Sequence, residues 1–230
     1  LVDGAKTDGV DSMLKALRQR LEVSAPLSKA HGKIFWFRSG DNLLADWILE
    51  PTTLDAGFVT APGVFSADGV DPASRLLVEA LPKKLGAVVA DYGAGWGYLS
   101  RQVLTRAEVK ELHLVEADHV ALHCARQNVE DPRAQFHWAD ARSWKAPRGL
   151  DTVVMNPPFH SGRSAEPELG QAFITAAARQ LSPSGQLWLV ANRHLPYEEV
   201  LAARFAVTRE VAGDNRFKIL MAQKPRSKRN

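Results

Sequence analysis

Cysteine is nearly absent from this chain of 230 residues, and long apolar runs are absent altogether. The single cysteine, Cys124, excludes an internal disulfide and is typical of a reducing compartment, so we expect a cytoplasmic protein. No stretch approaches the roughly 18 uninterrupted apolar residues of a membrane span, and the first residues lack the layout of a signal peptide. The sequence therefore predicts no membrane partner.

Strong charge of either sign is also missing, since the formal net charge is +3. The apolar content of 45% and the charged content of 24% describe an ordinary globular chain, long enough for one α/β domain and a fragment of another. The charge is unevenly placed, because residues 224–230 form a basic tail with four positive side chains and no negative one. This tail is either a solvated end or an arm that binds phosphates.

The first fifty residues differ in pattern from the rest. Residues 1–50 contain one helical spacing of apolar residues, at 9–20, and one expected strand, at 33–37. One helix and one or two strands do not bury a core, so we expect this region to be the end of a domain that leans on the rest of the chain or on absent residues. Residues 51–61 are predicted to be a connector, and residues 62–223 a second domain.

Strands and helices alternate after residue 62. Asp71 and Pro72 form a helix start, and further helices are expected after residue 97, near residues 120–125 with Val120 buried, and over residues 169–181. The seven expected strands begin near residue 88 and then cover residues 113–116, 135–139, 151–155, 186–191, 206–211 and 216–222. This pattern predicts a doubly wound α/β fold, with a mostly parallel seven-stranded sheet and a C-terminal antiparallel hairpin.

A glycine-rich loop follows the first strand of this domain, where ligands of such sheets bind. Asp91 precedes Gly93, Gly95 and Gly97, and glycines let the backbone turn sharply and approach a ligand closely. Glu116 lies nineteen residues after Gly97, at the end of the next strand, where a carboxylate can accept both hydroxyl groups of a ribose. The alternatives are plain tight turns for the glycines and a solvent-facing Glu116.

Two nucleotide-like cofactors fit such a loop, a dinucleotide and S-adenosylmethionine. Trp96, which is expected to pack in the core like Trp138, is bulky and lies at the helix start that a pyrophosphate would need. Asp91 would repel a pyrophosphate but attract an ammonium group, so the loop favours S-adenosylmethionine. Asp140, at the end of the third strand, is placed to accept from the adenine amino group, although it could instead form a turn.

The segment Asn156-Pro157-Pro158-Phe159 directly follows the fourth strand. The prolines fix the backbone, so the Asn156 side-chain oxygen and the Pro157 carbonyl become two acceptors aimed at one point. Such acceptors can bind the hydrogens of an aryl or amide nitrogen and turn its lone pair towards a methyl donor. Phe159 offers a face on which a planar base can stack, worth roughly 1–3 kcal/mol. The alternatives are a rigid turn and a core aromatic.

Three residues within or just after this segment are further candidates for contacts with a substrate. Pro158 and His160 adjoin Phe159, and Arg163 could reach a phosphate or remain a solvated loop charge. His119 and His123 have a spacing that suits a metal, but no third ligand is evident, so we expect no metal site.

In this order the motifs resemble the class I S-adenosylmethionine-dependent methyltransferases, and more narrowly the bacterial ribosomal RNA guanine-N2 methyltransferases of the "methyltransferase small" family. The resemblance covers residues 62–222. The matching segments are Pro62-Gly63-Val64-Phe65-Ser66, residues 91–97, residues 156–160, Val190-Ala191-Asn192 with Leu195-Pro196-Tyr197, and Arg216-Phe217-Lys218. This chain has Glu116 where the family more often has Asp, and both residues accept hydrogen bonds from ribose hydroxyls.

The resemblance implies that S-adenosylmethionine lies along the glycine loop and that residues 156–159 receive a flipped guanine. It implies ribosomal RNA or a ribosomal subunit as the partner. It also makes residues 1–50 a remnant of a degenerate, methyltransferase-like N-terminal domain that helps to bind RNA, and residues 62–223 the catalytic domain.

Other functions remain open. The acceptor could be adenine N6 or a glutamine amide of a protein. Methyltransferases for these acceptors more often carry Tyr where this chain has Phe159. A non-catalytic RNA-binding module of the same fold would have lost the glycines or Asn156, and this chain keeps both.

Overall fold

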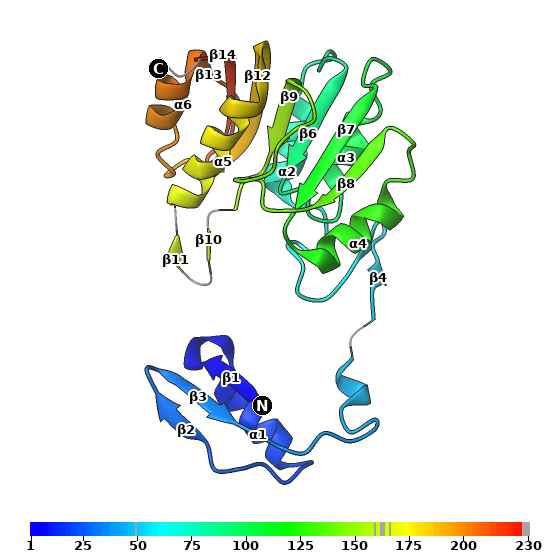
Figure 1. The fold of residues 1–230 in the computed structure, drawn as a ribbon, viewed down its shortest axis with the longest axis vertical. Helices are drawn as coiled ribbons and strands as arrows, with labels where there is room; N and C mark the ends of the chain where they lie inside the picture. The colour runs from blue at the N-terminus through cyan, green and yellow to red at the C-terminus, as the bar shows by residue number, and fades with distance from the viewer. Residues whose placement is uncertain (49, 159, 162–163, 166, 227–230) are drawn as a thin grey trace. The chain divides into compact units, whose positions relative to one another are not determined.

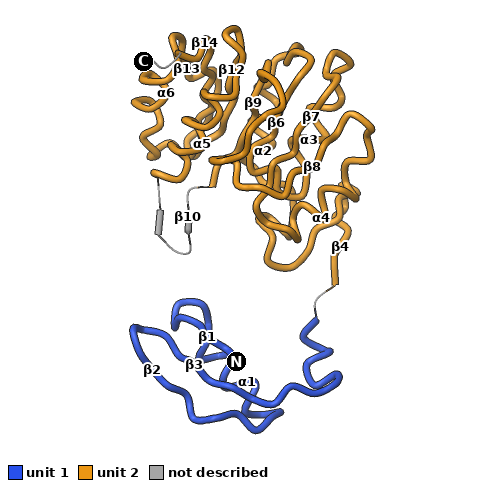
Figure 2. The backbone as a smooth tube through the Cα atoms, viewed as in Figure 1, with its two compact units in different colours: residues 1–49 blue, residues 50–230 orange. Residues whose placement is uncertain are grey.

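The computed structural model describes residues 1–48, 50–158, 160–161, 164–165 and 167–226. The chain divides into two compact units, Leu1–Leu49 and Glu50–Asn230, which Figure 2 shows in blue and orange. Within the described residues, no helix is both long and apolar enough to cross a membrane.

The first unit is a small sheet packed on one helix. Its elements are β1 (Val2–Ala5), η1 (Lys6–Asp8), α1 (Val10–Arg18), β2 (Leu27–Lys29), β3 (Gly32–Phe35) and η2 (Ala45–Trp47), with the strand order β1-β3-β2. Val10, Leu14 and Leu17 of α1 form a buried cluster with Phe35 of β3. This region therefore has a small core of its own. The sequence did not predict that core because β1 and β2 are short and carry few apolar residues.

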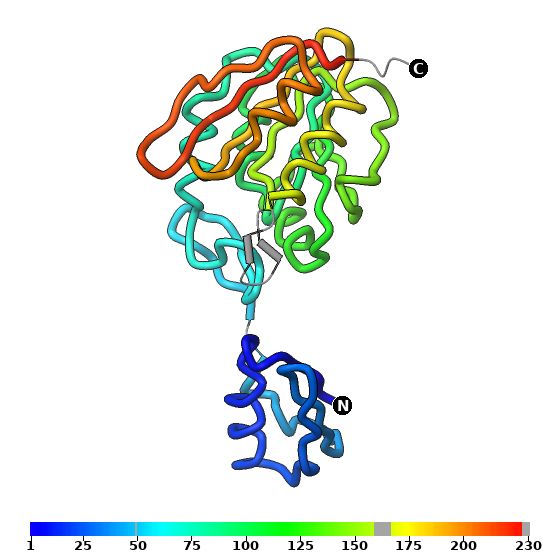
Figure 3. The backbone as a smooth tube through the Cα atoms, turned by 90° about the vertical axis from the view of Figure 1, so that its left-hand side faces the viewer, coloured from blue at the N-terminus to red at the C-terminus, as the bar shows by residue number. Residues whose placement is uncertain are grey.

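A seven-stranded sheet organises the second unit (Figure 1). Its strands are β6 (Val88–Tyr92), β7 (Glu111–Glu116), β8 (Ala134–Trp138), β9 (Leu150–Met155), β12 (Leu181–Asn192), β13 (Phe205–Gly213) and β14 (Phe217–Pro225). The order is β13-β14-β12-β9-β6-β7-β8; β12, β9, β6, β7 and β8 run parallel, whereas β14 is antiparallel to both of its neighbours. Figure 3 shows the β13–β14 hairpin, in orange and red, along one edge. The predicted fold class is confirmed.

Helices cover both faces of this sheet. They are α2 (Pro72–Ala80), α3 (Tyr98–Val103), α4 (His119–Asn128), α5 (Pro167–Gln180) and α6 (Glu198–Arg204). Ile174 of α5 and Leu201 of α6 belong to the core on one face, and Leu77 of α2 and Val103 of α3 belong to the core on the other. The sequence predicted α2 to α5 but not α6, whose seven residues include one buried side chain and so show little helical periodicity.

The segment predicted as a connector, residues 51–61, lies within the second unit. It contains the antiparallel pair β4 (Thr52–Thr53) and β5 (Val59–Thr60), and its Phe58 side chain is buried. The Asn128 side chain, at the end of α4, accepts from the Val59 N–H at 2.6 Å and donates to the Val59 carbonyl at 2.7 Å. The segment therefore packs on the second unit and is hydrogen-bonded to it, and it is not an extended linker.

The basic tail begins later than predicted, because β14 extends to Pro225. The Arg226 side chain then donates to the Phe205 carbonyl at 3.0 Å. Residues 227–230 lie outside the described part of the chain.

Two residues that were expected to be buried are exposed. Val120 on α4 is 48% exposed, and Leu122 is buried instead. Trp138 is 66% exposed at the end of β8, where its indole N–H donates to the Ala117 carbonyl at 2.9 Å and its ring packs edge-on against His119. An indole at a strand end can hydrogen-bond its N–H to the backbone and remain partly exposed to water. The large size of Trp138 is therefore not enough to predict that it is buried.

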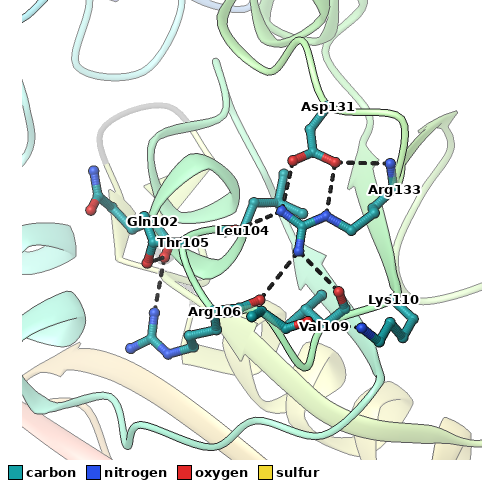
Figure 4. Close-up of polar contacts among 9 residues, drawn as sticks. Gln102, Leu104, Thr105, Arg106, Val109, Lys110, Asp131 and Arg133 are labelled. Carbon is teal, nitrogen blue, oxygen red and sulfur yellow. Dashed lines mark hydrogen bonds and ion pairs between the residues drawn. The ribbon is translucent and has the colours of Figure 1, made fainter.

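An arginine on the loop before β8 fixes the end of α3 (Figure 4). The Arg133 guanidinium donates to the carbonyl oxygens of Leu104 at 2.7 Å, Val109 at 3.0 Å and Arg106 at 3.2 Å, and also to the Asp131 carboxylate at 2.7 Å. The last carbonyls of a helix lack partners within the helix, so a guanidinium that reaches this region stabilises the helix end. The helix that follows the glycine loop is held at its C-terminus in this way.

Candidate active site

A cavity of about 470 Å³ lies at the carboxyl ends of four parallel strands, β6, β7, β8 and β9. This volume is within the range of small-molecule sites, and this edge of the sheet is where ligands of doubly wound folds bind. Seven of the residues predicted from the sequence line it: Gly93, Gly95, Glu116, Asp140, Asn156, Pro157 and Pro158. Phe65, Ala141, Arg142, Leu169 and Phe173 also contribute to its wall. Parallel strands thus bring together residues that are far apart in the sequence.

The three glycines of the loop have different roles, although each has a positive φ between +54° and +92°. Gly93 and Gly95 border the cavity, and a Cβ added to Gly95 would meet no atom within 4 Å. Gly97 does not border it, and a Cβ there would lie 2.9 Å from a methyl group of Val129. Two glycines therefore leave room for a ligand, whereas Gly97 allows α3 to start against α4.

Glu116 is held by the backbone on both of its oxygens. Its Oε2 accepts from the Gly95 N–H and its Oε1 from the Asp118 N–H, each at 2.8 Å. The carboxylate is half-buried in the cavity wall and keeps further lone pairs for a ligand. It is thus not a freely solvated side chain.

Asp91 does not line the cavity, contrary to the expectation that it contacts an ammonium group. It is completely buried, and its Oδ2 accepts from the Ser100 hydroxyl at 2.7 Å. Its Oδ1 has no hydrogen-bond partner among the described residues. Burial raises the pKa of this carboxyl to about 7. The side chain therefore contacts α3 rather than the cavity.

Asp140 forms the turn that the sequence left open and also lies at the cavity. It borders the cavity, and its Oδ1 accepts from the Arg142 N–H at 2.8 Å in a tight turn. The Arg142 guanidinium also binds the carboxylate, at 2.6 Å between Nη2 and Oδ2, and this hydrogen bond lowers the pKa of Asp140. Arg142 was not predicted as part of the site, because its position depends on this turn.

Asn156 is held through its amide nitrogen. Its Nδ2 donates to Asp71 Oδ2 at 2.9 Å and to Ser74 Oγ at 3.0 Å, both at the start of α2. Pro157 is buried and Pro158 is exposed. Neither α2 residue was predicted to reach the site, since Asp71 was recognised only as a helix cap.

The remaining predicted substrate contacts lie largely beyond what the structure describes. Phe159 and Arg163 are outside the described residues, and His160 is described only as the backbone of β10 (His160–Ser161), which pairs with β11 (Ser164–Ala165). Another aromatic residue stands at the cavity: Phe65 is 62% exposed, and its carbonyl accepts from the Trp96 indole at 2.9 Å.

The donor set suits a nucleoside-containing cofactor better than a metal. Among the described residues, no three His, Cys, Asp or Glu side chains gather closely enough to hold a metal ion. The cavity is instead lined by Gly93 and Gly95, which have no side chains, by apolar residues, and by the carboxylates of Glu116 and Asp140. These groups fit an amino acid joined to a nucleoside, since carboxylates accept from hydroxyl and amino groups.

The comparison with protein families gives one match. The family described as "Methyltransferase small domain" matches residues 55–221. This range contains the glycine loop, Glu116, Asp140 and residues 156–159.

Curated proteins match over most of the chain. The ribosomal RNA small subunit methyltransferase C of Hahella chejuensis is 28% identical over an alignment of 229 positions, which covers 95% of this chain and 67% of that protein. The ribosomal RNA large subunit methyltransferase G of Alcanivorax borkumensis is 33% identical over an alignment of 169 positions, which covers 71% of this chain and 43% of that protein. The chain thus spans about two thirds of the length of the first relative and less than half of the second.

A solved structure matches the fold over almost the whole chain. The 16S rRNA N2 G1207 methyltransferase of Thermus thermophilus, in complex with AdoMet and guanosine, superposes with a TM-score of 0.76 at 28% identity. The match covers 96% of this chain and 63% of that one.

Proposed function

Because this chain belongs to the methyltransferase small domain family, we propose that it methylates the exocyclic N2 amine of a guanine in ribosomal RNA. Membership makes it a class I S-adenosylmethionine-dependent methyltransferase. The family, the enzyme class and the cofactor predicted from the sequence are thereby confirmed. The acceptor and the roles of individual residues are our proposal.

Four residues of the cavity fit the cofactor. Gly93 and Gly95 leave room for it, Glu116 can accept from ribose hydroxyls, and Asp140 can accept from the adenine amino group. Bound S-adenosylmethionine supplies a methyl group activated by a positively charged sulfur. Because two backbone N–H groups already fix Glu116, its oxygens are preorganised for further hydrogen bonds. Asp91 is assigned no direct contact, since it is buried away from the cavity.

One observation carries the assignment of the acceptor site: Asn156 borders the same cavity as the glycine loop, with its amide nitrogen turned towards α2. The amide oxygen is then the group left to accept from a substrate. An exocyclic amine of guanine is a poor nucleophile because its lone pair is delocalised into the ring. Hydrogen bonds from this amine to Asn156 Oδ1 and to the Pro157 carbonyl localise the lone pair on the nitrogen. The amine then needs no strong base, because its proton can leave after methyl transfer.

The choice of guanine rests on the relatives. The Thermus thermophilus enzyme is named for N2 of a guanine, and the curated relatives are named as ribosomal RNA methyltransferases. Flipping a base out of a helix costs a few kcal/mol, and least for an unpaired base. We therefore expect the target in a loop or in a partly assembled ribosomal particle.

Residues 1–50 are assigned to the end of an N-terminal domain that helps to bind RNA, and residues 62–223 to catalysis. Lys29 and Arg38 are exposed in the first unit, so changing both to Glu should weaken RNA binding and flatten its salt dependence. Fluorescence anisotropy at two salt concentrations measures this effect. Unchanged RNA affinity would remove the RNA-binding role from this region.

Transfer of labelled methyl groups tests the proposed reaction. Ribosomal RNA and partly assembled subunits from cells that lack the protein are incubated with the chain and labelled S-adenosylmethionine. Nucleoside analysis should then show N2-methylguanosine. Label in N6-methyladenosine or in a protein glutamine would replace guanine by one of the other acceptors. Cofactor binding without any transfer would indicate a non-catalytic RNA-binding module.

A further inference from the structure

The amide of Asn156 is fixed by groups that the reaction itself does not use. Its nitrogen donates to Asp71 Oδ2 at 2.9 Å and to Ser74 Oγ at 3.0 Å, across 85 and 82 residues of sequence. A carboxylate has no proton to donate, so the atom facing Asp71 must be the amide nitrogen. The orientation of Asn156 thus follows from the chemistry of its neighbour.

Asp71 and Ser74 are themselves held by α2. Asp71 is the N-cap of this helix, and the same Oδ2 accepts from the Ser74 N–H at 2.7 Å. Ser74 is buried on the face of α2 that packs on the sheet. One carboxylate oxygen therefore serves two donors, the start of the helix and the amide at the cavity.

This arrangement has two consequences for Asn156. With both hydrogens of Nδ2 engaged, a flip of the amide would break two hydrogen bonds and place its oxygen against a carboxylate, which is unfavourable. A charged acceptor on the nitrogen also polarises the amide and increases the negative charge on its oxygen. Both effects make Oδ1 a better acceptor for an amine.

We infer that Asp71 and Ser74 are positioning residues that orient and polarise the Asn156 amide, so that its oxygen rather than its nitrogen meets the amine that receives the methyl group. This inference rests on the proposed function, because it assigns Asn156 to the acceptor amine. Both residues also border a smaller cavity of about 40 Å³ beside the glycine loop, so the cofactor affinity of each variant is measured as well.

Three variants of the full chain separate this role from helix capping. Asp71→Asn keeps a good N-cap and the shape of the side chain but removes the charge, and Asp71→Ser keeps an N-cap but is too short to reach Asn156. Ser74→Ala removes the second acceptor. Asp214→Ser is the matched control, because the Asp214 side chain also accepts from two backbone N–H groups, those of Arg216 and Phe217, and lies between β13 and β14 away from the cavity.

The expected results form an ordered series in kcat at saturating cofactor. We expect losses of about 100-fold for Asp71→Ser and about tenfold for Asp71→Asn and Ser74→Ala, with no loss for the control. The cofactor Kd from calorimetry should stay within about twofold of the wild type. Melting temperatures of the Asp71 variants should fall no further than that of the control, because Asn and Ser can still accept from the backbone N–H groups.

The outcomes distinguish this inference from the proposed function. If the wild type methylates guanine but the Asp71 and Ser74 variants keep the kcat of the control, the positioning role is wrong and the function stands. If the wild type methylates adenine or glutamine instead, the guanine assignment is wrong, and the same order of kcat on that acceptor supports the positioning role. A wild type that binds the cofactor and transfers no methyl group overturns both.

Discussion

The two sides of the cavity hold their polar groups by different means. On the cofactor side, Glu116 is fixed by the backbone N–H groups of Gly95 and Asp118. On the acceptor side, Asn156 is fixed by the side chains of Asp71 and Ser74 from α2. The first arrangement follows from the path of the main chain. The second requires three particular side chains, so we expect the acceptor side to tolerate substitution less well.

The largest effect is expected from Asn156→Ala on the acceptor side. Removing the amide oxygen should lower kcat about 1,000-fold, which corresponds to about 4 kcal/mol, because the acceptor for the amine is lost. The cofactor Kd should remain nearly unchanged, since no predicted cofactor contact is removed. Single-turnover methyl transfer together with calorimetry measures both quantities, and near-normal turnover would contradict the catalytic role of Asn156.

A pH effect is expected next, from the carboxyl beneath the glycine loop. Burial raises the pKa of Asp91 from 3.8 to about 7, so its protonated form stabilises the fold. This stabilisation is complete below pH 4 and is lost as the pH rises to about 7. The free energy of unfolding should therefore fall over this window, by on the order of 3 kcal/mol.

Asp91→Asn, which keeps an acceptor for Ser100, should flatten this part of the pH dependence. Urea unfolding of both proteins between pH 4.5 and 8 measures the difference between their free energies of unfolding. A difference that does not vary with pH would show that the carboxyl does not titrate in this range.

A smaller effect is expected from Glu116→Ala on the cofactor side. Loss of the carboxylate should weaken cofactor binding about thirtyfold, or about 2 kcal/mol, because the hydrogen bonds that we propose it makes to the ribose are removed. Glu116→Gln retains one acceptor oxygen and should lose less. Calorimetric titration with S-adenosylmethionine tests this order, and an unchanged Kd in Glu116→Ala would refute the ribose assignment.

The smallest effects are expected from alanine substitutions in the glycine loop, and they should differ between Gly95 and Gly97. Gly97→Ala should lower the free energy of unfolding by about 1 kcal/mol, because φ is +92° and the new Cβ would meet Val129 at 2.9 Å. Gly95→Ala also has a positive φ, but its Cβ would extend into open space beside the cavity. We therefore expect Gly95→Ala to reduce cofactor affinity more than Gly97→Ala does. Equal cofactor affinities would show that Gly95 does not border the bound cofactor.

The sequence predicted those parts of the site that depend on local patterns. A strand followed by spaced glycines, and a strand followed by Asn156 and two prolines, specify their own turns, and parallel pairing then brings these turns to one edge of the sheet. The family, the cofactor and the seven-stranded sheet followed from the same motifs and are confirmed. The individual roles of the site residues stay predictions until the variants are measured.

Other parts of the site depend on contacts that no local pattern records. Asp71 reaches Asn156 across 85 residues, and only the packing of α2 on the sheet brings them together. The position of Asp91 away from the cavity was not predicted because β6 is buried on both faces, so alternation along the strand does not show which side chains face the cavity.

The Arg133 contacts at the end of α3 bear on how a cofactor enters. Arg133 binds the Leu104 carbonyl at the end of this short helix and two carbonyls of the segment that follows it, while Gly97 at its start lies close to Val129. The loop between β6 and α3 is fixed as well, because the Gly93 N–H donates to the Val115 carbonyl and the Gly97 N–H to the Ala94 carbonyl, each at 2.9 Å. We expect the cofactor to associate without a preceding rearrangement, so the observed association rate should rise linearly with cofactor concentration and show no plateau.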